Sequence, residues 1–165
     1  MIKRLSGCCI LTLLLSTSSM VQAIDLRELR MINHSINLDF QRRAETGQRY
    51  SHSALAKYHR VRQQYPNART MITHAQHVTP SGYAIEPHTV ITVEADNTLW
   101  VMDYELLNIY TAQQRRDLKP VSSIEIKDGQ VWIHQNRQDW GIEKSQQADS
   151  ATTERLKSAL LNTPG

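Results

Sequence analysis

Cysteine is almost missing from this sequence, and its two cysteines, Cys8 and Cys9, stand side by side near the start. Both fall in the segment 1–23, which we predict below to be removed. The remaining 142 of the 165 residues then hold no disulfide, no thiol nucleophile and no thiolate ligand for a metal. The stability of the protein must therefore come from a hydrophobic core, and this length suits one domain.

The motifs of common hydrolases, metalloproteases and nucleotide-binding proteins are also missing, since the chain has no G-x-S-x-G, H-E-x-x-H, P-loop or G-x-G-x-x-G. We therefore expect no cofactor. An excess of one charge is absent too, because removing Lys3 and Arg4 leaves 17 of the 19 basic residues against 16 acidic ones. This balance gives no support to a nucleic-acid partner. The basic clusters at 42–43, 57–62 and 115–116 are typical of solvated faces.

No apolar run is long enough to cross a bilayer, which takes about 20 residues. A short run at 8–15 follows the basic residues Lys3 and Arg4, and small residues precede a possible cut after Ala23. This order predicts a cleavable signal peptide over 1–23. We expect a periplasmic or secreted protein without an integral membrane segment after cleavage.

A lipoprotein is the alternative to simple cleavage. Residues 5–8, Leu-Ser-Gly-Cys, are similar to a bacterial lipobox, in which the cysteine is lipidated. A lipobox follows its hydrophobic core, whereas here the apolar run follows Cys8. The order favours cleavage after Ala23 and leaves lipidation of Cys8 as the second possibility.

Two helices are predicted at the start of the mature chain. Over 25–44, apolar residues recur three and four positions apart between charged ones, which indicates an amphipathic helix. They are Leu26, Leu29, Ile32, Ile36 and Phe40. A second helix is expected over 53–64, with Ser53 as its N-cap and Pro66 preventing its continuation.

After Pro66 the apolar period shortens to about 2, which predicts strands joined in hairpins. Strands at 70–78 and 83–86 flank a turn containing Pro80, and strands at 89–95 and 98–104 flank Asp96-Asn97. In the second of these hairpins Ile91 is expected opposite Met102 and Val93 opposite Trp100.

The strongest hairpin signal is Asp128-Gly129, a favoured type I′ turn, between strands at 123–127 and 130–134. Its register places Ile124 opposite Ile133 and Ile126 opposite Val131. The other side of the hairpin carries Glu125, Trp132 and His134.

These elements predict an α+β fold, with two N-terminal amphipathic helices packed on a curved antiparallel sheet of hairpins and a short C-terminal helix. We assign residues 24–145 to one domain and 146–165 to a polar tail with a helix over 153–161. The order of elements over roughly 25–143 is similar to the NTF2-like cone, and the run 124–134 resembles its closing hairpin. The resemblance rests on topology, and cones of this kind serve as enzymes, binding modules and scaffold parts of secretion machines.

Histidine offers candidate metal ligands at His74, His77 and His88, because imidazole suits zinc and copper. The turn at Pro80 would bring His88 near His74. However, His74 and His77 are three apart on a strand and should point to opposite faces unless a bulge intervenes. Scattered surface histidines without a metal are therefore the favoured interpretation.

Catalysis would need paired titratable groups, and the best pair is Asp103 with His134, if their strands are neighbours. Charged residues on the outer face of a half-buried sheet are the more ordinary explanation. Trp132 and Trp140 stand outside the apolar pattern and are either contact residues or covered by a lid.

The favoured hypothesis is an exported, non-enzymatic accessory protein that binds another protein of the bacterial envelope or of a secretion or assembly system. Trp132, His134 and Trp140 are its expected binding residues. Two alternatives stay open. One is an inhibitor or immunity protein against a toxin or hydrolase, and the other is an NTF2-like ligand-binding or enzymatic pocket that uses Asp103 and His134.

Overall fold

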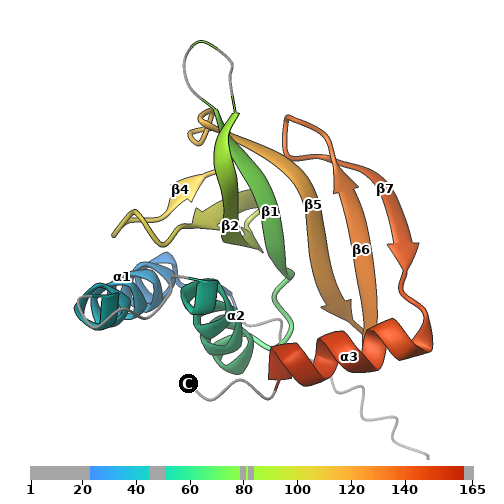
Figure 1. Ribbon diagram of the computed structural model, residues 1–165. Helices are drawn as coiled ribbons and strands as arrows, with labels where there is room; N and C mark the ends of the chain where they lie inside the picture. The colour runs from blue at the N-terminus through green and yellow to red at the C-terminus, as the bar shows by residue number, and fades with distance from the viewer. Residues whose placement is uncertain (1–22, 45–50, 79–80, 82–83, 162–165) are drawn as a thin grey trace, which may run out of the picture.

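The computed structural model describes residues 23–44, 51–78, 81 and 84–161. It contains three helices and seven strands, arranged as a curved sheet with the helices along one end of it (Figure 1). In chain order the elements are α1 (Leu26–Ala44), α2 (Ser51–Gln64), β1 (Thr70–Val78), β2 (Ala84–Ala95), β3 (Thr98–Met102), β4 (Tyr110–Thr111), β5 (Leu118–Lys127), β6 (Gln130–Asn136), β7 (Ile142–Gln147) and α3 (Ser150–Leu161). The predicted α+β class is confirmed.

Residues 1–22 of the predicted signal peptide lie outside the described residues, so the signal peptide stays a prediction. Among the residues that are described, no helix has the length and apolar character needed to cross a membrane.

The sheet is antiparallel and open, with the order β4-β3-β2-β1-β5-β6-β7. Both predicted registers are confirmed, because Ile91 pairs with Met102 in β2–β3 and Ile126 pairs with Val131 in β5–β6. Asp128 and Gly129 have φ values of 51° and 71°, as a type I′ turn requires. The turn residues thus set the register of both hairpins.

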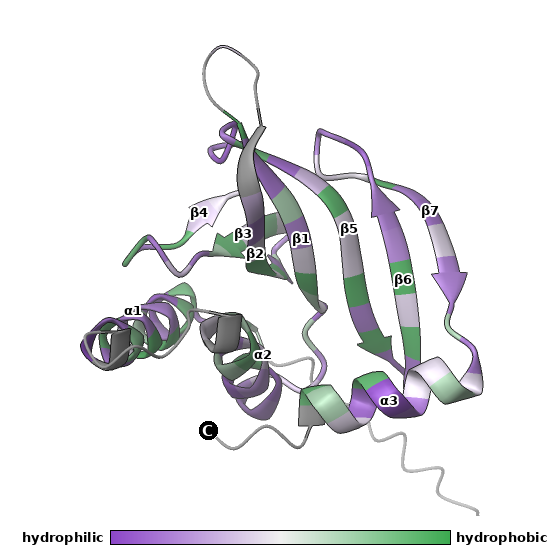
Figure 2. Cartoon of the chain, viewed as in Figure 1, coloured by the Kyte–Doolittle hydropathy of each residue, from purple (hydrophilic) through white to green (hydrophobic). Residues whose placement is uncertain are grey.

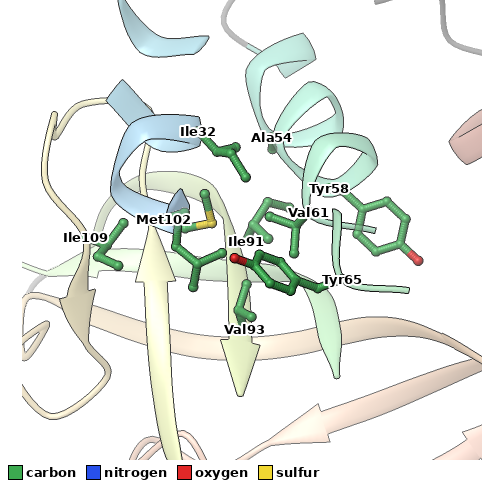
Figure 3. Close-up of a cluster of buried hydrophobic side chains, with 10 residues drawn as sticks. Ile32, Ala54, Tyr58, Val61, Tyr65, Ile91, Val93, Met102 and Ile109 are labelled. Atoms are coloured by element: carbon green, nitrogen blue, oxygen red, sulfur yellow. The ribbon is translucent and has the colours of Figure 1, made fainter. Parts of the chain in front are cut away.

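The core lies between the helices and one face of the sheet. Val61 and Tyr65 of α2 point toward Ile91, Val93 and Met102 in Figure 3, and all five are buried. The spacing of three and four along the helix and of two along the strands brings these side chains together.

The opposite face of the sheet carries a second buried cluster and a line of polar side chains. The cluster contains Ala75, Val90, Val101, Ala112, Leu118 and Trp140. Beside it, hydroxyl groups of Thr92, Thr73 and Ser123 and the amide of Asn136 form successive hydrogen bonds of 3.1, 2.9 and 2.7 Å. This polar line crosses β2, β1, β5 and β6.

Two strands differ from expectation. Separate strands were predicted at 83–86 and 89–95, whereas the described residues from Ala84 to Ala95 form the single strand β2. This strand tolerates Pro87 because its pairing with β3 reaches only as far as Ile91. The predicted boundary after residue 145 falls inside β7, whose side chains are nearly all exposed. Figure 2 shows β7 mostly purple and white, whereas green bands recur along β5 and β6. An edge strand of this kind lacks an apolar period.

The helix ends also differ in detail. α2 begins at Ser51, two residues before the predicted N-cap Ser53. The Ser53 side chain is buried, and its Oγ has no hydrogen-bond partner within the described ranges. Asp149 caps α3, because its carboxylate accepts a hydrogen bond of 2.8 Å from the backbone N–H of Thr152. Leu160 of α3 is buried, so this helix packs against the domain.

Candidate functional site

A groove of about 1000 Å³ opens on the face of the sheet opposite the α1–α2 core. One wall is the connection from α2 to β1, residues 66–70, and the other is the end of the β5–β6 hairpin, residues 125–130. The lining is completed by Arg62 of α2 and by Trp132, His134 and Ser145. Two of the three binding residues predicted from sequence therefore line one groove.

A buried, hydrogen-bonded pair of side chains underlies this groove. His134 Nε2 lies 2.9 Å from Glu125 Oε2, and its Nδ1 lies 2.9 Å from the Ser145 hydroxyl. Both ring nitrogens are thus occupied, and the side chains of His134 and Glu125 are 5% and 9% exposed. The pairing of Ser123 with His134 and of Glu125 with Trp132 brings these residues to one face.

The pair continues to solvent through Arg69. Its guanidinium lies 3.3 Å from Glu125 Oε2 and 3.1 Å from Glu94 Oε2. Arg69 is about 39% exposed, so its contribution to stability is screened by water. The floor of the groove is therefore charged, and most of its polar groups already form hydrogen bonds or ion pairs with one another.

The two tryptophans have different environments. Trp132 is half-buried and lines the groove. Trp140 is only 8% exposed, because it packs into the second buried cluster against residues such as Ala75 and Leu118. It adopts a left-handed backbone with φ of 70°, and its N–H donates to the carbonyl of Arg137 at 3.0 Å. The structure therefore places Trp140 in a core, and its predicted binding role has no exposed surface to support it.

The predicted pair of Asp103 and His134 does not form. Their segments are separated by β2, β1 and β5 in the sheet. Asp103 instead accepts hydrogen bonds from Arg115 Nη1 at 2.6 Å and lies 2.8 Å from His88 Nε2. All three side chains are nearly fully buried.

Electrostatics explain why this buried carboxyl stays ionised. Burial would raise the pKa of Asp103, but hydrogen bonds and charge from His88 and Arg115 outweigh it and hold that pKa well below its usual range. Burial likewise opposes protonation of His88, and the bond to Asp103 more than compensates and raises the pKa of His88. Asp103 is thus an ionised carboxylate held in a buried hydrogen-bonded cluster with His88 and Arg115.

The three candidate metal-binding histidines do not all lie on one face of the sheet, because side chains alternate between the two faces along a strand. His74 is exposed on one face of β1, while His77 lies on the other. The expected approach of His88 to His74 was wrong, because the register places His88 opposite Ala75, on the face of His77. The ring centres of His77 and His88 are 6.1 Å apart. His88, Asp103 and Glu105 together form a group with the potential to hold a metal ion.

The expectation of a solvated basic face was wrong at Lys57. Its basic cluster was interpreted as a solvated face, yet the Lys57 side chain is fully buried and its Nζ has no hydrogen-bond partner among the described residues. Burial lowers the pKa of Lys57 to about 7, although the charge of Asp103 acts in the opposite direction. The Oδ1 atoms of Asn33 and Asn37 on α1 are also buried and have no partner among the residues that are described.

Sequence reasoning found part of this geometry. The Asp128-Gly129 turn predicted that Glu125, Trp132 and His134 share a face, and the structure places all three in the groove. It missed Ser145, because β7 has no apolar period, and Arg115, because only the fold brings its turn to Asp103.

Comparison with known protein-family models, with curated proteins and with solved structures finds no match for this chain.

Proposed function

We propose that this chain is an exported, non-enzymatic accessory protein that binds an extended segment of another protein of the bacterial envelope. The segment adds to the sheet beside β7 and places side chains in the groove beside Trp132. The single observation that carries the proposal is that the groove adjoins an edge strand.

The edge supports an extended partner. β7 pairs with β6 on one side, and no described strand lies along its other side. Such an edge leaves backbone N–H and C=O groups available to a further strand. The exposed side chains of β7 leave this edge uncovered by an apolar layer.

The groove supports side-chain recognition. Ser145 of β7 lines it, and the pairing of Ser145 with His134 shows that this side of β7 faces the groove. Every second side chain of an added strand would point to the same face. Half-buried Trp132 gives such a side chain a large flat contact, the kind of residue that dominates binding energies.

The side chains at the floor of the groove already have hydrogen-bond partners, which argues against catalysis there. Glu125 and both ring nitrogens of His134 already have partners among the described residues. The NTF2-like pocket alternative needed Asp103 beside His134, and the sheet separates them. An inhibitor or immunity protein would use the same groove, and the chemistry of the partner distinguishes the two.

Site-specific photocrosslinking in the producing cell tests the proposal. A photoreactive residue in place of Ser145 should crosslink one envelope protein, and the same residue in place of Val121 should not. Val121 is 41% exposed, lies on β5 and does not line the groove. Trp132→Ala should lower the affinity of the purified partner at least tenfold.

The purified pair then gives the decisive measurement. Hydrogen exchange at the β7 amides should slow when the partner is bound, because an added strand protects them. Equal crosslinking from positions 145 and 121, unchanged affinity of Trp132→Ala, or unprotected β7 amides would each refute the proposal.

A further inference from the structure

The other end of the same sheet face holds a second polar cluster, none of whose residues lines the groove. His88 lies on β2, and Asp103 directly follows β3, which pairs with β2. One nitrogen of His88 and one carboxylate oxygen each of Asp103 and Glu105 lie within 4.8 Å of one another. His88 and Asp103 are buried while Glu105 is exposed, so the group reaches solvent on one side.

A second imidazole lies beside this group. The ring centres of His77 and His88 are 6.1 Å apart, and the His77 side chain is 32% exposed. Two imidazoles that bind one zinc at about 2.1 Å have ring centres roughly 5–6 Å apart. His77 Nε2 lies 3.4 Å from Asp117 Oδ2, and a rotation of this partly exposed side chain away from Asp117 would turn it toward an ion held by His88.

Formal charge favours a divalent cation here. Asp103, Glu105 and Asp117 carry three negative charges, and Arg115 is the permanent cation bonded to two of them. With neutral imidazoles the cluster keeps a formal charge of −2. The buried amine of Lys57, which also feels the charge of Asp103, offsets this only while it is protonated.

The ligands are already held in place by their neighbours. Arg115 binds Asp103 Oδ2, so that Oδ1 faces His88, and the backbone N–H of Glu105 fixes Oδ1 at 3.1 Å. The ring of Tyr104 stacks on His88 at 4.7 Å between centroids, with 27° between the planes. Such supporting contacts orient the ligands of metal sites.

We propose that His77, His88, Asp103 and Glu105 form a zinc site, in which the ion takes the position of the proton between His88 Nε2 and Asp103 Oδ1. Two imidazole nitrogens and two carboxylate oxygens suit zinc, whereas magnesium and calcium prefer oxygen ligands alone. The site does not depend on the proposed binding function, and zinc binding is measured without any partner.

Zinc binding to the chelator-treated mature protein tests this site by calorimetry, and cobalt substitution adds its visible absorption as a signature of the ligand set. We expect one zinc per chain. His77→Gln and Glu105→Gln replace partly or fully exposed side chains and should fold normally by circular dichroism. Each should weaken zinc binding at least tenfold and change the cobalt spectrum.

His74→Gln is the matched control, because His74 lies on the same strand but on the opposite face. It should leave the affinity for zinc unchanged. The proposal is overturned if the intact mature protein binds no zinc, if His77→Gln and Glu105→Gln bind as tightly as the unaltered protein, or if His74→Gln loses as much affinity as they do.

Discussion

Lys57→Met should make the protein more stable, although it removes a charge from a chain of balanced charge. The Lys57 side chain is fully buried, its Nζ has no partner in the part of the chain that the structure describes, and burial lowers its pKa from 10.5 to about 7. At 1.36 kcal/mol for each pKa unit, this lowering means that keeping the buried ammonium protonated costs the folded protein about 5 kcal/mol. Methionine fills a similar volume without a charge.

The effect of pH on this stability has a definite sign. Between pH 7 and 10.5 the unfolded chain keeps the proton on Lys57 while the folded protein releases it, so the free energy of unfolding rises with pH. The destabilisation by Lys57 is complete below pH 7 and disappears toward pH 10.5. Lys57→Met should therefore be several kcal/mol more stable than the unaltered protein at pH 6, with an upper limit of about 5 kcal/mol, and the gap should close as the pH rises.

Urea unfolding followed by circular dichroism from pH 6 to 10 measures this gap. Lys127→Met serves as the control, because Lys127 is exposed and its replacement should change stability by less than about 0.5 kcal/mol. The reasoning is refuted if Lys57→Met is no more stable than the unaltered protein at pH 6, or if the gap is the same at pH 6 and pH 10.

Four substitutions test other parts of the structure by urea unfolding. Asp103→Asn should cost about 3–5 kcal/mol at pH 7, because buried Arg115 keeps only the partly exposed Asp117 as a carboxylate partner and buried His88 loses its carboxylate partner as well. In the unaltered protein this contribution should be lost as the pH falls below about 4, since the pKa of Asp103 is depressed in the folded state. Trp140→Ala should cost about 3–5 kcal/mol and Trp132→Ala clearly less, because only Trp140 is fully buried; equal losses would contradict the assignment of Trp140 to a core. Gly129→Ala should cost about 1 kcal/mol, because Gly129 has a φ of 71°, and an unchanged midpoint would argue against that turn.

The hairpins were predictable because their information is local. Asp128-Gly129 specifies a turn, the turn specifies the register, and the register places Glu125 and His134 on one face. The alternation of apolar residues then identifies which face is buried. Contacts of this kind lie within about ten residues of each other, where sequence patterns are strongest.

The remaining features depend on contacts between distant segments. Lys57 belongs to a basic cluster by sequence, and only the packing of α2 buries it. The prediction that Asp103 pairs with His134 was wrong because it depends on which strands are neighbours in the sheet. No sequence pattern gives the strand order β2-β1-β5. β7 was missed because both its faces are polar, so neither face carries a burial pattern.

The hydrogen bonds along the line of hydroxyl groups across the sheet all run in one direction, from donor to acceptor. Ser123 donates its hydroxyl hydrogen to Asn136 Oδ1, so Thr73 must donate to Ser123, and Thr92 must donate to Thr73. These bonds join the β1–β2 hairpin to the β5–β6 hairpin, which lie about fifty residues apart in the chain. A slip of one residue between β1 and β5 would reverse the faces and break the whole series at once. The two halves of the sheet should therefore open as a single cooperative unit, and amide exchange along β1 and β5 should report one common opening free energy.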